Sequence, residues 1–273
     1  MTQMATRPVA APLPPRVLGL VNWLGIATVM RAEFQVYRRF WLMTVGGPVL
    51  SMGLYLLVFV LAIGPSRIDG AGDAVLRFMA PGMVMMTLLQ WASQNVAFSV
   101  VYKKLEGIFA DYLSVPVMPW ELVFGFVVSS MITGMITTLP VLIMVMIVTG
   151  VAFTAPLIAV AVVISSSAMM AVFGFLMGLW AKKWDGLSAV IGFLIVPLTF
   201  LSGTFVAIDR FPDWAAAIMV VNPIYYAVDA FRGAMGGPYD VPIWVSLTVL
   251  VGIFVVLLAV TGFLVGRGWR IKS

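Results

Sequence analysis

Six long stretches without Asp, Glu, Lys or Arg constrain this chain more than any other feature of its sequence. They cover residues 42–63, 78–101, 122–149, 157–181, 187–208 and 243–266. About 20 apolar residues in a helix cross a hydrocarbon core of about 30 Å, and a charge at its centre costs roughly 3 kcal/mol. Membrane β-barrels use shorter segments of alternating polarity. The pattern therefore predicts an all-α integral membrane protein with six transmembrane helices.

The composition agrees with this prediction and excludes several kinds of chemistry. The chain is 62% hydrophobic and 10% charged, whereas a soluble domain is about half apolar and about one quarter charged. It has no Cys and no His, which removes disulfides, zinc sites and His general bases. Neither a GxxxxGK[ST] phosphate loop nor a GxGxxG motif occurs. We therefore expect no catalytic residues, no metal and no cofactor bound by this chain.

A shorter apolar run at residues 17–30 precedes the first span. Arg31, Glu33, Arg38 and Arg39 follow it closely, and apolar residues continue at helical spacing to Trp41. A signal peptide is an alternative, but no small-x-small cleavage site follows. The run is better interpreted as an amphipathic helix lying in the membrane interface. We thus expect a flexible cytoplasmic segment 1–16, a membrane domain 17–266 and a cytoplasmic tail 267–273.

Basic residues are unevenly distributed between the two sides of the six spans. One side carries Arg7, Arg16, Arg31, Arg38, Arg39, Lys103, Lys104, Lys182, Lys183, Arg267, Arg270 and Lys272, and the other Arg67, Arg77, Arg210 and Arg232. The positive-inside rule places the first side, with both termini, in the cytoplasm. The net charge of +5 is then a topology signal, with anionic lipids as its natural partner and no need for nucleic acid.

The loop between the second and third spans contains a short amphipathic pattern. Leu105, Ile108, Phe109, Tyr112 and Leu113 share one helical face. Lys104, Glu106 and Asp111 lie mostly off that face, and Pro116 and Pro119 end the pattern. Such a cytoplasmic helix either rests on the bilayer or docks into a groove of a partner protein.

After the fifth span, the chain contains two apolar segments too short to cross a membrane. Pro212 begins the first, with Trp214 close behind, and Asn222-Pro223 separates the two. Asp229 and Arg232 are spaced to pair on one face of the second. These features predict a re-entrant helical hairpin entering from the outer side, with a folded external loop as the alternative.

Polar residues within the spans have two interpretations. Thr87, Gln90 and Gln94 share a face of the second span, and Ser130, Thr133 and Thr137 form a stripe on the third. They either line a path between subunits or join helices by hydrogen bonds. Gly174 and Gly178 form a GxxxG motif that permits close helix packing, within the chain or between subunits.

Three pieces of sequence carry a family resemblance: LSVPVMP at 113–119, FLSGTFVAIDRFPDW at 200–214 and NPIYYAVDAFRG at 222–233. With these pieces, the chain resembles the ABC type-2 permease family, the membrane subunits of bacterial exporters related to nodulation-factor and daunorubicin-resistance systems. The resemblance runs from about Arg31 to Gly237.

The resemblance implies a function. The 102–119 loop corresponds to the family's ATPase-coupling helix, and the hairpin helps to close the translocation path. The expected partners are two cytoplasmic ATPase subunits that hold ATP and magnesium, and a second copy of this chain as a homodimer. The implied cargo is a bulky amphipathic lipid, lipid-linked glycan or hydrophobic drug, exported through the bacterial inner membrane. An ATPase-independent carrier and a non-transporting scaffold are the alternatives.

Overall fold

The computed structural model describes residues 21–63, 71–108 and 118–267. Within these ranges the chain is helical and contains no strand, as predicted. Five helices there are long and apolar enough to cross a membrane, or six if one bent pair of short helices counts as a span. The five are α2 (Trp41–Ile63), α3 (Ala71–Leu105), α5 (Pro119–Thr149), α6 (Pro156–Trp180) and α11 (Ile243–Gly266).

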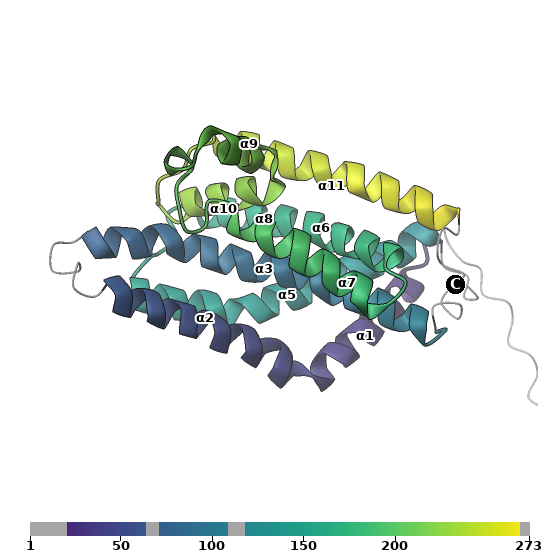
Figure 1. Ribbon diagram of the computed structural model, residues 1–273. Coiled ribbons are helices and arrows are strands. Elements are labelled where there is room, and N and C mark those ends of the chain that lie inside the picture. The colour runs from purple at the N-terminus through teal and green to yellow at the C-terminus, as the bar shows by residue number, and fades with distance from the viewer. Residues whose placement is uncertain (1–20, 64–70, 109–117, 268–273) are drawn as a thin grey trace, which may run out of the picture.

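The α3 helix is the centre of the bundle, and α5 and α6 pack against it (Figure 1). In its most apolar window, 67% of the residues are buried, compared with 11% for α2 and for α11. The long helices lie side by side, so the bundle has two ends (Figure 1). The α1 end contains the last residues of α3, α6 and α11. The hairpin end contains the first residues of α3 and α6, together with the short helices α9 and α10.

The α1 helix (Trp23–Arg39) matches the amphipathic helix expected before the first span. The Asn22 side chain accepts a hydrogen bond from Gly25 N at its start. Ile26, Val29 and Tyr37 are buried, and Trp23 is exposed. Val29 packs directly on Gly125 of α5, where an added Cβ would lie 2.9 Å from it. Its position at the membrane surface stays a prediction.

The predicted fifth span, residues 187–208, is wrong at its C-terminal end. The structure has α7 (Trp184–Val190), a π-helical segment η2 (Ile191–Ile195) and α8 (Val196–Phe200), followed by residues without helix. Pro197 has no N–H to donate, and Gly203 adopts a φ of +72°, which favours glycine. The Asn222 amide donates to the carbonyls of Leu198 (2.7 Å) and Leu201 (3.2 Å). A distant residue thus terminates the helix.

The two short helices predicted after this span are present. After the 3₁₀ turn η3 (Ile208–Arg210), α9 covers Asp213–Val221 and α10 covers Pro223–Ala234. They meet at 85°, the Asn222 side chain accepts from Ile224 N, and Pro223 is the first residue of α10. Both helices lie at one end of the bundle beside the start of α11 (Figure 1). Their re-entrant position in a membrane stays a prediction.

Candidate functional site

At the α1 end, a buried ion pair lies next to the point where α3 ends and the predicted coupling loop begins. Lys103 Nζ contacts Glu33 Oε1 of α1 and also donates to Ser99 Oγ (2.6 Å). Ser99 in turn donates to Glu33 Oε2 (2.6 Å), and Lys103 lies 5.1 Å from the centre of the Phe126 ring. Because the lysine and the glutamate side chains are at most 10% exposed, this pair joins α3 firmly to α1.

Lys104 lies in the last turn of α3 and points to the end of α6. Its ammonium group donates to the carbonyls of Gly178 (3.2 Å), Leu179 (2.7 Å) and Ala181 (2.8 Å). These carbonyls belong to the C-terminal turn of a helix, where orphan acceptors and the helix dipole favour a cation. The sequence predicts Lys104 as a coupling-helix residue, and the structure adds that it ties the end of α3 to the end of α6.

The other end of the same loop is fixed by one carboxylate. Glu121 of α5 accepts from Met118 N (2.8 Å) and from Asn22 N (2.6 Å), and it is 1% exposed. Both ends of the 105–118 connection are therefore tied to the bundle, one to α1 and α6, the other to the start of α1. Glu106 lies in an exposed turn after α3. The remaining expected coupling residues, Phe109, Asp111, Tyr112, Leu113 and Pro116, lie outside the described residues.

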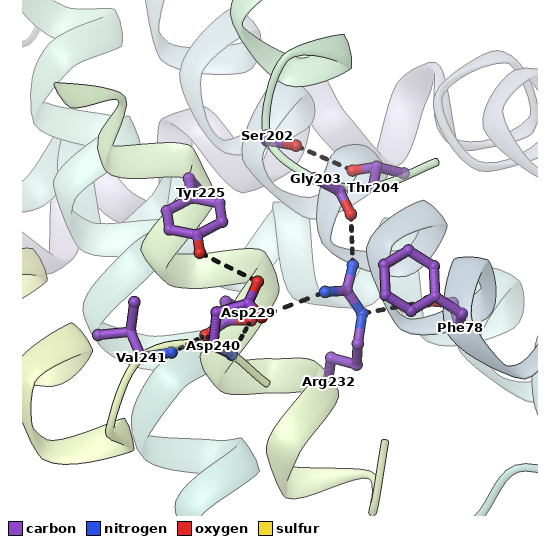
Figure 2. A network of polar contacts seen from close by, with 9 residues as sticks. All are labelled: Phe78, Ser202, Gly203, Thr204, Tyr225, Asp229, Arg232, Asp240 and Val241. Atoms are coloured by element: carbon purple, nitrogen blue, oxygen red, sulfur yellow. Dashed lines mark hydrogen bonds and ion pairs between the residues drawn. The ribbon is translucent and has the colours of Figure 1, made fainter. Parts of the chain in front are cut away.

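At the hairpin end, the predicted pairing of Asp229 and Arg232 is present (Figure 2). Arg232 Nη1 lies 3.7 Å from Asp229 Oδ1, and both side chains are almost fully buried. Arg232 also donates to the carbonyls of Phe78 and Gly203, and its guanidinium lies 3.9 Å from the centre of the Phe78 ring. The arginine thus joins α10 to α3 and to the loop that follows α8.

Asp229 connects α10 to the beginning of the last span. It accepts from Asp240 N (3.0 Å) and Val241 N (2.9 Å), just before α11 (Figure 2). Tyr225 donates to Asp240 Oδ2 (3.2 Å). The other predicted hairpin residues have simpler positions: Pro212 and Pro223 stand at the starts of α9 and α10, and Trp214 is exposed. We name the Asp229–Arg232 pair with its partners Phe78, Gly203, Asp240 and Val241 the hairpin latch.

A cavity of about 350 Å³ lies between α2, α3 and α8. Its lining is mixed: Ser51, Tyr55, Thr87 and Gln90 contribute polar atoms among methionines and aromatic rings. Thr87 donates to Met83 O (3.1 Å), and the Gln90 amide donates to Thr199 Oγ1 (3.0 Å). Two of the predicted path-lining residues, Thr87 and Gln90, therefore line this cavity, whereas Gln94 is half-buried outside it.

The polar stripe on the third span has a different role. Ser130 donates to Ala92 O (2.7 Å), Asn95 donates to Thr133 (2.6 Å), and Thr137 shares a hydrogen bond with Tyr37 (3.0 Å). All three α5 residues are buried. These contacts fit the helix-joining alternative, and they connect α5 to α3 and to α1.

Sequence reasoning missed several residues of these sites. Glu33, Ser99 and Glu121 belong to no motif, although a carboxylate beside an apolar span indicates a buried partner. Asn222 was recognised as a helix break, but its bonds to the end of α8 were not. Among the described residues, no group of His, Cys, Asp or Glu could hold a metal ion.

Comparison with known proteins agrees with this architecture. The sequence model described as "ABC-2 type transporter" matches residues 25–235, which include both the loop and the hairpin. Curated relatives include the inner membrane transport permease YadH of Escherichia coli strain K12, of E. coli O157:H7 and of Shigella flexneri. Each is 28% identical over 256 residues, covering 92% of this chain and 98% of the relative. With five or six apolar helices and a family match over most of its length, this multi-pass membrane chain belongs to the ABC-2 type transporter family.

Proposed function

We propose that this chain is the membrane-spanning subunit of an ATP-driven exporter. Two copies would pair in a bacterial inner membrane, and two copies of a separate cytoplasmic ATPase would bind ATP and magnesium. The family match and the relatives named inner membrane transport permeases support this role. The concentration of Lys and Arg at the α1 end supports an orientation with both termini in the cytoplasm.

The observation that carries the proposal is the anchoring of both ends of the 105–118 connection. At one end, Lys103 binds α1 and Lys104 binds the end of α6. At the other end, Glu121 binds the backbone that begins α1. These contacts are buried and charge-assisted, so they resist stretching. A push on this connection by an ATPase would therefore move α1, α3, α5 and α6 together.

The other end of the bundle supports an exit that opens by rearrangement. The hairpin latch holds α10, α3 and the start of α11 together through buried charges. Between the two ends, the α2–α3–α8 cavity offers both apolar walls and hydrogen-bonding groups. That combination suits an amphipathic cargo such as a lipid, a lipid-linked glycan or a hydrophobic drug.

The test is to reverse a charge on the exposed turn that begins the connection. In Glu106→Arg, the bundle should fold, because the side chain is exposed and no described contact depends on it. We expect ATP hydrolysis by the co-purified ATPase to lose its stimulation by the membrane subunit, with export reduced about tenfold or more. Asp185→Arg, an exposed charge reversal on α7 at the same end, is the matched control and should retain both activities.

Two results would contradict the proposal. Export by the purified chain without any ATPase would indicate a self-contained carrier. Unchanged ATP hydrolysis and export in both Glu106→Arg and Phe109→Asp would show that this connection does not dock the ATPase.

A further inference from the structure

The hairpin end contains a second cavity, separate from the one between α2, α3 and α8. Its volume is about 480 Å³, and it lies between the first turns of α3, residues 205–210 and residues 236–238. Phe78 and Phe205 supply apolar walls. Arg77 and Arg210, from segments far apart in the sequence, both line the cavity.

The two arginines place two positive charges on the lining of this cavity, and none of the described lining residues is acidic. Both side chains are exposed, and the ion pairs formed within the described residues include neither of them. Arg232, by contrast, is neutralised by Asp229. Asp209, the carboxylate next to Arg210 in the sequence, is exposed and forms no ion pair among the described residues. Guanidinium groups favour phosphate because their planar N–H donors match its oxygens.

The position of the cavity indicates the level of lipid headgroups. Arg77 is six residues after the start of α3, which corresponds to about 9 Å along a helix. Trp214 of α9 is 69% exposed and Tyr239, next to the cavity-lining Pro238, is 52% exposed. Exposed Trp and Tyr at the ends of spans are typical of the membrane–water interface. An apolar wall with two arginines at this level suits an amphiphile.

We propose that this cavity binds a phospholipid of net negative charge, from the leaflet at the hairpin end. The phosphate binds between Arg77 and Arg210, and the first carbons of the acyl chains lie against Phe78 and Phe205. The Phe78 ring also covers Arg232 of the hairpin latch (Figure 2). The lipid and the latch therefore share one aromatic wall. This proposal does not depend on the transported cargo.

The test measures the Tm of the full chain in dodecyl maltoside as dioctanoyl phosphatidylglycerol is added. Dioctanoyl phosphatidylcholine has the same chains and phosphate but no net charge, because its choline group is cationic. Inorganic phosphate provides the anion without chains. We expect phosphatidylglycerol to raise Tm to a plateau, and the other two to raise it far less at the same concentration. Arg77→Gln and Arg210→Gln should each weaken the apparent affinity about tenfold, and the double variant should lose the saturable response.

Arg267→Gln is the matched control, because Arg267 is an exposed arginine at the opposite, α1 end of the bundle. It should respond to phosphatidylglycerol as the wild type does. Without added lipid, all four variants should denature at the wild-type temperature, since each changes exposed side chains. A full response in the double variant would overturn the site. Equal stabilisation by inorganic phosphate would overturn the lipid as its ligand.

Discussion

Arg232 and Asp229 form a buried ion pair on α10, and the burial of each charge depends on the other. In Asp229→Asn, we expect a loss of about 3 kcal/mol in the free energy of unfolding, because a buried cation loses its counter-charge. In Asp229→Leu/Arg232→Met, the loss should be smaller than the sum of the losses in Asp229→Leu and in Arg232→Met, since neither charge remains. Thermal denaturation of each purified variant measures these losses. Asp213→Asn, an exposed carboxylate on α9, is the control and should change stability by less than about 0.5 kcal/mol. Strictly additive losses would show that the two charges do not interact.

At the scale of helices, the GxxxG motif packs α6 against α3 within this chain. A Cβ at Gly174 would lie 2.0 Å from the Ser93 carbonyl oxygen, and one at Gly178 would lie 2.7 Å from Val100. We expect Gly174→Ala to separate α3 from α6 and to cost about 3 kcal/mol, seen as a lower Tm and a lower yield of folded protein. Gly252→Ala on α11 is the matched control, because its Cβ would meet nothing within 4 Å. If Gly174→Ala kept the wild-type Tm, α3 and α6 of the wild-type protein could not be packed as closely as described here.

At the scale of helices, most of the fold could be predicted from the sequence, but some helix ends and distant contacts could not. The spans at 42–63, 157–181 and 243–266 agree closely with α2, α6 and α11, because length and apolarity alone define them. The fifth helix ends eight residues early, because its terminal carbonyls are bound by Asn222, which local patterns do not connect to it. Likewise, the contacts of Lys103 and Lys104 could not be predicted, since their partners lie 70 or more residues away in the sequence. The sequence indicates Lys103 only as a topology signal and Lys104 also as a coupling-helix residue. Pairings within one helix, such as that of Asp229 with Arg232, could be predicted because the spacing of the residues places them on one helix face.

For the whole molecule, the two ends of the bundle should face opposite compartments. The chain has no Cys, so a single introduced Cys reports its own position. We expect Trp214→Cys to react with a membrane-impermeant maleimide on spheroplasts, and Glu106→Cys to react only after permeabilisation, because the excess of basic residues at the α1 end favours the cytoplasmic side. The unmodified chain should stay unlabelled. Labelling of Glu106→Cys in intact spheroplasts would reverse the orientation and place the coupling connection beyond the reach of any ATPase.

The contacts of the hairpin latch also have an order in time, because a ribosome delivers the chain from its N-terminus. The carbonyls that accept from Arg232, on Phe78 and Gly203, are already synthesised when Arg232 emerges. The backbone donors that satisfy Asp229 emerge 11 and 12 residues after it, immediately before the last span. Until then, Asp229 has no backbone donor from that segment. Asp229 therefore gains its backbone donors only when the segment before α11 is in place, and a nascent chain interrupted before Asp240 would hold this carboxylate with Arg232 alone.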